Sequence, residues 1–426
     1  MQPGPIYLIG PSGNPNFGDE FIAAAWLKYL AKVRPGTDVW LDCPQPGLAQ
    51  VLFEGMHPRL RVTNTLWRLV HGTSELAPDA AAETIRARVT GLGSPLYDLG
   101  LLKLREAETL HLIGGGFVNG TWPAHAGLVV AMQAVHEVTG ARLVATGQGL
   151  MPALSEPPVE SLFQGFTHAA SRDEAGALAY GIPHELDDAF LGVTAEIGRA
   201  PAEPGLYVCI QSDTVDADRF DKAVELARSA VQEAAARGTT AYYLEAIPGA
   251  DRLAYESLAD LIPEERFIPF VRIWSEGLPL SAEQTWVTSR FHFHLLAAAA
   301  GAGGTAVGMK KGYYDVKHES VAALGSGWAL AFEEPAGGDG HGSERPATPE
   351  QPNLLHRNLQ ALVDRKLAEA RSIYPPLPRT ELLLHRAAAA RRFVAARASD
   401  ALAALPAGLT RSGGASRKPS APSRSA

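Results

Sequence analysis

The fold is decided by the stretch PIYLIGPSGNPNFGDEFIAAAWLKYL at residues 5–30, which joins three patterns in a row. It begins with an apolar run typical of a buried strand, and it ends with apolar side chains at helical spacing. The part between them is rich in glycine, proline and polar side chains, as a loop is. Strand, glycine-rich loop and helix in this order predict the opening unit of a Rossmann-like domain.

The loop of this unit matches neither common nucleotide-binding fingerprint. It lacks the G-x-G-x-x-G spacing of dinucleotide-binding folds, and no Gly-Lys-Ser/Thr follows it as in a P-loop. We expect at least one of Asp19 and Glu20 to cap the helix that follows. A loop with Asn16, Gly18 and two acids at the carboxyl end of a strand is also suited to binding sugar hydroxyls or accepting a proton.

The chain is long enough for two such domains. Its 426 residues exceed the size of about 250–300 residues at which single hydrophobic cores stop growing. Residues 201–205 (PAEPG) give a linker signal, and the strand and helix patterns restart after them. We therefore expect an N-terminal Rossmann-like domain over 1–200, a C-terminal βα domain over 204–332, a mobile loop over 333–352, helices within 353–404 and a disordered basic tail over 405–426.

Further strands are expected in both halves of the sequence. Residues 50–105 are mixed and mostly helical in pattern, with breaks at prolines. Apolar or β-branched runs predict strands over residues 39–41, 109–113, 142–149, 167–171, 183–190, 206–210, 240–245, 267–270 and 286–289.

Composition narrows the class of protein. A formal net charge of -8 argues against a general nucleic-acid binder. Cys43 and Cys209 match no zinc or redox spacing, so we expect buried thiols in a reducing compartment. We identify no signal peptide and no apolar run of the roughly 20 residues that span a bilayer. The sequence thus predicts a cytoplasmic protein with at most peripheral membrane contact through its basic tail.

A second stretch, WVTSRFHFHLLAAAA at residues 286–300, places Arg290 and His292 where a strand passes into a helix. Ligands of α/β folds bind at carboxyl ends of strands, and a helix start adds free N–H groups and partial positive charge. The combination predicts an anion site; the alternative is a buried arginine paired with a carboxylate and two packing histidines. His292 and His294 would share one face of a strand, but we see no strong metal spacing and predict no metal site.

Two other predicted strands also end in residues suited to binding. Gly114, Gly115 and Gly116 follow the strand over 109–113, and successive glycines let a ligand approach the backbone closely. Arg172 follows the strand over 167–171 and is a second arginine at a strand end.

Several motifs, in this order and spacing, resemble the polysaccharide pyruvyl transferase family over roughly residues 5–330. The segment Tyr314–Lys317 resembles the family's tyrosine-to-lysine segment, although Lys310 and Lys311 compete with Lys317 for the role of its lysine. The other matching segments are 16–20 (NFGDE), 114–116 (GGG), 171–173 (SRD), 188–190 (DAF) and 289–292 (SRFH).

The resemblance implies two Rossmann-like domains that face each other across a cleft, as in the glycosyltransferase B architecture. It implies an enzyme that transfers the enolpyruvyl-derived group of phosphoenolpyruvate onto two hydroxyls of a sugar, which gives a cyclic pyruvate ketal. The acceptor would be a glycan of the cell envelope or its precursor, lipid-linked precursors included. No cofactor other than the donor substrate is implied.

The resemblance also assigns roles to residues. Arg172, Arg290, His292 and the backbone of Phe291 would hold the donor, with Lys317 joining them. His292 would donate the proton or bind the phosphate, and Asp19 or Glu20 would take the hydroxyl proton. The residues that would face the sugar acceptor are Asn16, Gly18, Glu20, Gly115, Gly116 and Asn119.

Two other functions fit the same pattern. The first is a glycosyltransferase with a nucleotide-sugar donor, in which the same cationic residues would hold a diphosphate. The second is a binding protein that kept the fold without turnover. The Arg-x-His at 290–292 together with Arg172 favours pyruvyl transfer, because a nucleotide-sugar enzyme more often shows an acidic residue for the ribose in its second domain.

Overall fold

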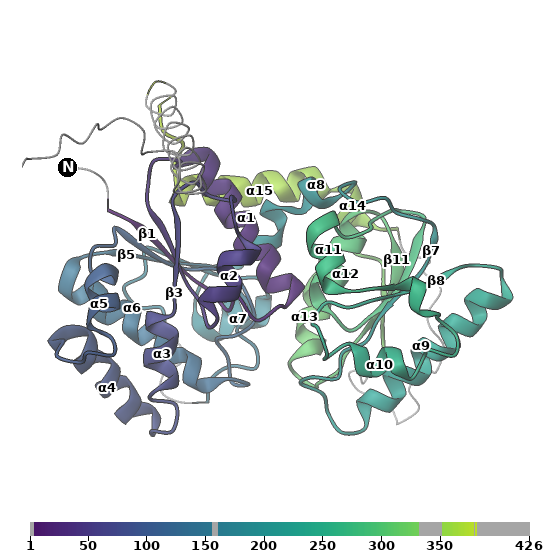
Figure 1. The fold of residues 1–426 in the computed structure, drawn as a ribbon, viewed down its shortest axis with the longest axis horizontal. Coiled ribbons are helices and arrows are strands. Elements are labelled where there is room, and N and C mark those ends of the chain that lie inside the picture. The colour runs from purple at the N-terminus through teal and green to yellow at the C-terminus, as the bar shows by residue number, and fades with distance from the viewer. Residues whose placement is uncertain (1–3, 156–160, 332–351, 379, 381–426) are drawn as a thin grey trace, which may run out of the picture. The chain divides into compact units, whose positions relative to one another are not determined.

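The computed structural model describes residues 4–155, 161–331, 352–378 and 380, and it contains two six-stranded sheets (Figure 1). Neighbouring strands are parallel in both sheets. The first sheet consists of β1 (Ile6–Ile9), β2 (Val39–Asp42), β3 (Leu60–Thr63), β4 (Thr109–Leu112), β5 (Arg142–Gln148) and β6 (His168–Ser171). The second consists of β7 (Gly205–Cys209), β8 (Ala241–Leu244), β9 (Phe267–Ile268), β10 (Gln284–Thr288), β11 (Gly303–Val307) and β12 (Ala329–Ala331).

Helices connect the strands of each sheet. Those of the first domain are α1 (Phe17–Val33), α2 (Pro46–Leu52), α3 (Thr65–His71), α4 (Pro78–Gly91), α5 (Asp98–Leu104), α6 (Ala126–Thr139), α7 (Glu174–Tyr180) and α8 (Val193–Glu196), with 3₁₀ turns η1 (Pro123–His125) and η3 (Asp188–Leu191). The second domain has α9 (Arg219–Ala236), α10 (Arg252–Glu256), η4 (Glu264–Arg266), α11 (Phe270–Glu276), α12 (Phe291–Ala299) and α13 (Tyr314–Ala323), followed by α14 (Leu354–Arg357) and α15 (Leu359–Ile373).

Both sheets have the same strand order. They read β3-β2-β1-β4-β5-β6 and β9-β8-β7-β10-β11-β12, so each reads 3-2-1-4-5-6 when counted from its own first strand. This is the Rossmann order, in which the order of the strands changes direction beside the first strand and ligands bind in the crevice there. The predicted fold class is confirmed: α/β, with two Rossmann-like domains in a glycosyltransferase B-type architecture.

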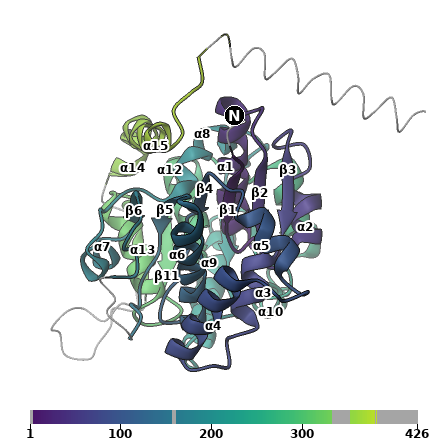
Figure 2. The same ribbon diagram turned by 90° about the vertical axis from the view of Figure 1, so that its left-hand side faces the viewer.

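The central strand β1 of the first sheet is buried on both faces because its side chains alternate between two apolar layers. In β1, Ile6 and Leu8 belong to the cluster under α1, whereas Tyr7 and Ile9 belong to the cluster under α3 to α6. In Figure 2 the helices α3 to α6 lie in front of this sheet. The continuous apolar run of the sequence therefore marks a central parallel strand.

The structure differs from the sequence prediction at several strands, and β12 also lies where no strand was predicted. β3 lies within the region predicted to be mostly helical; it is a partly exposed edge strand with a weak apolar pattern. β11 was not predicted; it begins with Gly303 and Gly304, and a Cβ on Gly304 would collide with the Trp286 carbonyl of the neighbouring strand. No strand covers 183–190, because the Asp187 carboxylate accepts the Ala189 N–H and starts η3 instead.

The first turn of α1 packs into the second domain. Phe17 lies 5.4 Å from Phe293 and 6.5 Å from Trp274, measured between ring centroids. The Phe17 N–H donates to the Ala246 carbonyl at 3.0 Å. The N-terminus of α1, which follows the first reversal point, is thereby fixed against the loops of the second sheet.

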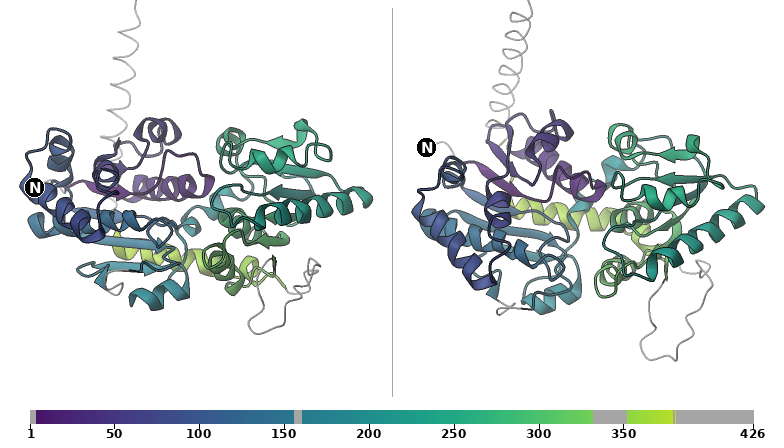
Figure 3. Two further views of the ribbon diagram at one scale, coloured as in Figure 1. Left: turned by 90° about the horizontal axis from the view of Figure 1, so that it is seen from below. Right: turned by 60° about the horizontal axis from the view of Figure 1, so that its bottom comes forward.

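The helix α15 returns from the second domain to the first (Figures 1 and 3). Its Lys366 is buried, and the ammonium lies 2.5 Å from Asp188 Oδ1 and 2.7 Å from Glu369 Oε2. The other Asp188 oxygen accepts hydrogen bonds from Trp26 Nε1 and the Gly114 N–H, at 2.6 and 2.7 Å. One buried ion-pair network thus joins α15, α1 and the first of the three glycines.

The remaining predictions concern the C-terminal segments, the two cysteines and membrane-spanning helices. Nearly all of the predicted loop over 333–352, most of the helix predicted after residue 377 and the basic tail lie outside the described residues. Cys43 and Cys209 are buried free thiols. Within the described part of the chain, no helix combines the length and apolar character needed to cross a membrane.

Replacing Lys366 with alanine should destabilise the protein by about 3–5 kcal/mol, because it leaves two buried carboxylates without their counterion. The measurement is the thermal midpoint of unfolding. Arg371→Ala, which removes an exposed cation from the same helix, should leave the midpoint nearly unchanged. Equal effects of the two substitutions would contradict a stabilising role for the buried network.

Candidate active site

A cavity of about 670 Å³ lies between the two domains at the carboxyl ends of both sheets. The loops that follow β1, β4, β7 and β10 line it, so both reversal points of the strand order contribute. The volume is in the range of about 300–1,000 Å³ that is typical of small-molecule sites. The ionisable residues that line it are Asp19, Arg68, His71, His125, Arg172, Asp213, Arg290, His292, Tyr313, Tyr314 and Lys317.

The start of α1 presents Asn16 and Asp19 to the cavity. Asn16 is the helix N-cap, and its Oδ1 accepts the Gly18 N–H at 3.3 Å. The expectation that Asp19 or Glu20 caps this helix is therefore wrong. The Asn16 Nδ2 donates to Asp19 Oδ2 at 2.7 Å, so the same side chain caps the helix and orients the carboxylate.

Glu20 faces the protein interior and not the cavity. Its side chain is buried, and Oε1 accepts the Gly13 N–H at 2.7 Å. Burial raises the pKa of Glu20 well above its usual value. This corrects the prediction that Glu20 binds substrate: it holds the loop between β1 and α1 in shape.

His292 lies directly against the first turn of α1. A Cβ on Gly18 would collide with the imidazole of His292, so this close approach requires glycine. The two residues belong to different domains and both line the cavity. The structure therefore brings together a residue predicted for the acceptor side and one predicted for the donor side.

Asp187 connects two of the predicted catalytic residues. Its Oδ2 accepts a hydrogen bond from Arg172 Nη1 at 2.7 Å, and its Oδ1 lies 3.5 Å from His292 Nε2. Burial by itself would raise the pKa of Asp187, but the charges of His292 and Arg172 outweigh burial and hold it below its usual value. The Arg172 guanidinium also lies over the Phe291 ring at 4.2 Å, which fixes its plane.

Lys317 completes the group of cations. Its Nζ lies 3.5 Å from the ring centroid of Tyr313 and 4.8 Å from that of Tyr314. Among the described residues it forms no ion pair. Burial lowers its pKa well below the usual value, and Arg172 and Arg290 lower it further. The lining of the cavity includes Lys317 and not Lys310 or Lys311.

The triple-glycine loop lies beneath these cations. A Cβ on Gly116 would come within 2.9 Å of Lys317 Nζ and 3.1 Å of Arg172 Nη2. The Tyr313 hydroxyl donates to the Gly116 carbonyl at 2.9 Å, across the two domains. Because Gly116 has no side chain, the Lys317 ammonium of the second domain can lie over this loop of the first domain.

Asp19 is the carboxylate that faces this group of cations. Burial raises its pKa, and the positive charges of His292, Lys317 and Arg172 oppose that rise. An acid so placed is suited to exchanging a proton with a bound hydroxyl.

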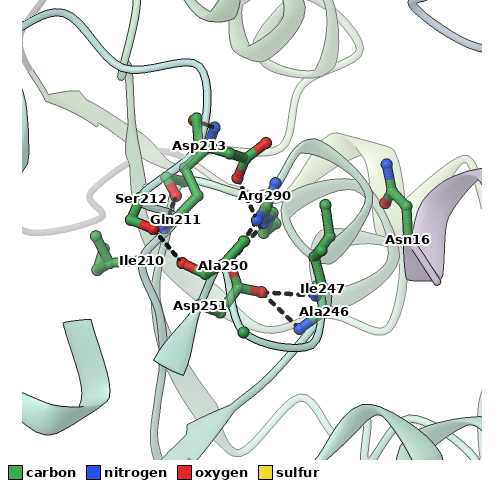
Figure 4. Close-up of polar contacts among 12 residues, drawn as sticks. Asn16, Ile210, Gln211, Ser212, Asp213, Ala246, Ile247, Ala250, Asp251 and Arg290 are labelled. Carbon is green, nitrogen blue, oxygen red and sulfur yellow. Dashed lines mark hydrogen bonds and ion pairs between the residues drawn. The ribbon is translucent and has the colours of Figure 1, made fainter. Parts of the chain in front are cut away.

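Arg290 is held by two carboxylates of its own domain, as Figure 4 shows. Nε donates to Asp251 Oδ1 at 3.0 Å, and Nη2 donates to Asp213 Oδ1 at 2.6 Å. The second Asp251 oxygen accepts the N–H groups of Ala246 and Ile247 at 2.7 and 2.8 Å. Arg290 therefore fits both interpretations of the sequence: it lines the cavity, and it pairs with a buried carboxylate.

His294 belongs to the packing behind the site. Because α12 begins at Phe291, His292 and His294 stand two positions apart on a helix, and the expectation that they share one face of a strand is wrong. His294 Nδ1 lies 3.2 Å from His318 Nδ1, and His318 Nε2 lies 3.2 Å from the Ser289 carbonyl. Across the described residues, no group of three His, Cys, Asp or Glu side chains is placed to hold a metal ion.

Two further predicted binding residues lie away from the cavity lining. Asn119 is fully buried, and its amide donates to the carbonyls of Gly116 and Gly149 at 3.1 and 3.4 Å while its Oδ1 accepts the Thr121 N–H. Gly115 has φ of 147° and its N–H donates to the Gly147 carbonyl. We correct both assignments: these residues shape the triple-glycine loop, and of that group Gly116 lines the cavity.

An aromatic wall on the first domain lines one end of the cavity. Trp67, Phe117, Trp122 and His125 line it and contact one another, with ring centroids 5.0 to 6.5 Å apart. This end carries no acidic lining residue near α3, where the exposed Arg68 and His71 also face the cavity. A pyranose ring can place its apolar C–H face on such a wall.

Sequence analysis missed several residues of this site. Asp187 lies within the stretch predicted as a strand over 183–190, and Asp213 follows the strand predicted over 206–210; neither was predicted as a site residue. Asp251 gave no signal, because it occurs within a helical pattern far from Arg290 in sequence. A carboxylate partner of an arginine is set by tertiary contact and leaves no local pattern.

No family model and no curated protein matches the chain. Among solved structures, it is similar to a putative UDP-N-acetylglucosamine 2-epimerase from Listeria monocytogenes, with 11% identity, TM-score 0.46, and 88% of this chain and 98% of that chain covered. It is also similar to an E. coli heptosyltransferase, with 15% identity, TM-score 0.35, and 71% and 88% covered. A glycosyltransferase from Siraitia grosvenorii in complex with UDP has 12% identity, TM-score 0.42, and 86% and 94% covered. These similarities concern the fold of the chain alone.

Replacing Gly18 with alanine should push the His292 imidazole from its place and lower kcat/KM by about 10²-fold, because small displacements of reacting groups are costly. The measurements are kcat/KM from steady-state turnover and, for the same proteins, the thermal midpoint of unfolding. Gly47→Ala is the matched control, since a Cβ there meets no atom within 4 Å. A fully active Gly18→Ala enzyme would argue against a catalytic place for His292.

The buried histidine pair predicts a pH dependence of stability. Burial lowers the pKa of His318 to about 4, below its usual value of 6.5. His318 therefore contributes stability that is present above pH 6.5 and lost as the pH falls toward 4. The His318→Gln variant should lose roughly 3 kcal/mol less free energy of unfolding over this range than the parent protein. Urea unfolding at several pH values measures this, with the exposed His71→Gln as control; identical pH slopes for parent and variant would contradict it.

Proposed function

We propose that the protein is a pyruvyl transferase that moves the enolpyruvyl-derived group of phosphoenolpyruvate onto hydroxyls of a sugar. The observation that carries the proposal is the convergence of Arg172, His292, Lys317 and Asp19 at one place in the cavity. Three cationic or protonatable groups and one carboxylate thus meet there, drawn from both domains.

The donor suits this group of residues. Phosphoenolpyruvate carries a phosphate and a carboxylate close together, and arginine binds either group through paired N–H donors. The N-terminus of α12 opens at Phe291 into the same cavity, and its free N–H groups and partial positive charge favour an anion. Arg172 is already oriented by Asp187 and by the Phe291 ring, so little side-chain freedom is lost on binding.

The reaction proceeds by addition and elimination at one carbon. A general acid protonates the methylene carbon of the donor, and the positive charge forms at the carbon that bears the phosphate. One sugar hydroxyl attacks that carbon and gives its proton to a base. The C–O bond to phosphate then breaks, phosphate leaves with the bonding electron pair, and a second hydroxyl closes the ring and loses its proton. The products are the cyclic ketal and inorganic phosphate.

The side chains divide these tasks by chemistry. His292 and Lys317 are the candidates for the acid; burial lowers the pKa of Lys317, which makes its ammonium a better proton donor than an exposed lysine. Asp19 is the candidate base, held by Asn16 at the edge of the cavity. Arg172 stabilises the charge of the departing phosphate. The aromatic wall on the first domain provides the surface for the acceptor sugar.

Glycosyl transfer from a nucleotide sugar is the second candidate. The architecture and the cavity volume of about 670 Å³ favour it, because the cavity exceeds what phosphoenolpyruvate alone would fill. Against it, Glu245 at the end of β8 uses its carboxylate to accept the N–H groups of Gly249 and Phe270, at 3.1 and 3.3 Å. That acid is therefore engaged within the protein and not free to bind a ribose.

A thermal-shift titration separates the two candidates. We expect phosphoenolpyruvate to raise the thermal midpoint and uridine diphosphate to leave it unchanged, because a ligand that binds the native protein stabilises it by mass action. The Lys317→Gln and Arg172→Gln variants should lose the shift, whereas Lys310→Gln, outside the cavity lining, should keep it. A shift with uridine diphosphate alone would overturn the proposal in favour of the second candidate.

A further inference from the structure

Arg290 has one partner that is built into the fold. Asp251 is fully buried, and its Oδ1 accepts from both Nε and Nη2 of Arg290, the side edge of the guanidinium. Its Oδ2 accepts the Ala246 and Ile247 N–H groups. Four hydrogen bonds therefore tie this carboxylate to the arginine and to the loop after β8, as Figure 4 shows.

The second partner of Arg290 is attached far more loosely. The Asp213 side chain is 39% exposed, whereas that of Asp251 is 0% exposed. Among the described residues, the Asp213 side chain accepts one hydrogen bond, from Arg290 Nη2 to Oδ1 at 2.6 Å. A single hydrogen bond at the cavity surface holds the Asp213 carboxylate in place.

The hydrogen bond to Asp213 uses an N–H group of the Arg290 guanidinium that a bound anion would also need. Nη2 carries two hydrogens, and Asp251 accepts one of them together with Nε–H. The remaining hydrogen points along the end edge of the group, beside Nη1, which makes no hydrogen bond to any described residue. A phosphate or carboxylate that binds this end edge needs one hydrogen from Nη1 and one from Nη2. The Asp213 oxygen occupies half of that edge.

The backbone before Asp213 is fixed, so its side chain is the part that can move. The Ser212 N–H and hydroxyl both donate to the Ala250 carbonyl, and the Gln211 amide donates to the Asp213 carbonyl. Thr214, which follows, has φ of 52°, a left-handed conformation that is unusual for a β-branched residue. Both Asp213 and Thr214 line the cavity.

We infer that Asp213 is a specificity-determining residue that competes with the donor's anionic group for the end edge of Arg290. The inference rests on the proposed function in one respect, namely that the donor is an anion held in this cavity. A ligand must replace the internal carboxylate before it can use both N–H groups. Ligands with two or more negative charges, such as a phosphate beside a carboxylate, gain enough from the surrounding cations to do so. Monoanions such as pyruvate do not, so the internal carboxylate selects for the phosphorylated compound.

A role of Asp213 in orienting Arg290 would predict the opposite change in anion affinity. If Asp213 served only to orient Arg290, its replacement by asparagine would loosen the arginine and weaken anion binding. If it competes with the ligand, the same replacement removes the competitor while Asp251 still orients the arginine, and binding becomes tighter. The sign of the change in affinity therefore decides between the two roles.

The experiment is isothermal titration of the full chain with phosphoenolpyruvate, inorganic phosphate and pyruvate. We expect Asp213→Asn to bind phosphoenolpyruvate about threefold to tenfold more tightly, the range for removing one partly exposed charge partner. Phosphate should also bind more tightly, and pyruvate should bind the variant measurably better than the parent protein. The ratio of phosphoenolpyruvate to pyruvate affinity should fall.

Asp216→Asn is the matched control. Asp216 lies in the same loop, its side chain is 38% exposed, and it faces Arg219 and not Arg290. Its replacement removes the same charge at a similar exposure, so the affinity for phosphoenolpyruvate should stay as in the parent protein. An equal gain in both variants would mean that net charge alone acts, and would overturn the inference.

The remaining outcomes separate this inference from the proposed function. If phosphoenolpyruvate binds the parent protein but Asp213→Asn binds it equally or more weakly, the inference fails and the proposed donor stands. If phosphoenolpyruvate binds neither protein while phosphate binds Asp213→Asn more tightly than the parent, competition at Arg290 is supported and the proposed donor fails. The thermal midpoints of both variants, expected within a few degrees of the parent, show that the proteins remain folded.

Discussion

Positive charges that are gathered in one cavity repel one another and lose hydration, and the architecture of this site follows from that constraint. Such groups cost free energy unless carboxylates or other acceptors lie beside them. Arg172 has Asp187, and Arg290 has two carboxylate partners. Lys317 differs from the two arginines in that it forms no ion pair among the described residues. Its ammonium lies over two tyrosine rings instead, and burial lowers its pKa. Each of these cations of the cavity thus has carboxylate or aromatic partners within the protein, with which an anionic ligand must compete.

The same constraint explains why the site depends on contact between the domains. Asp187 belongs to the first domain yet lies beside His292 of the second. Gly18, in the first turn of α1, and Gly116, in the loop after β4, are small where the second domain brings its imidazole and its ammonium close. The packing of Phe17 among aromatic rings of the second domain, and the return of α15 to the first, hold these loops together. Neither Rossmann-like domain contains the whole group of charges by itself.

Much of the fold was predictable because its signals are local. The apolar run of β1, the loop with Asn16 and the helix after it are each visible in a short window, and so are the glycines after β4. The failures also have local causes: β3 is a partly exposed edge strand, and Gly304 of β11 lies where a neighbouring carbonyl leaves no room for a side chain. His294 was misplaced because the helix begins earlier than the apolar pattern indicated.

The sequence by itself determined that there are two βα domains and that arginine, histidine, asparagine and acidic side chains stand at the ends of their strands, since hydrophobic period and turn residues act within a few positions. Only the tertiary structure decided which of them meet. In the folded protein, Glu20 faces the interior, and Lys317 lines the cavity whereas Lys310 and Lys311 do not. Arg290 pairs with the carboxylates of Asp251 and Asp213. These pairings join residues far apart in the chain, and their free energy comes from burial and charge, which no local pattern records.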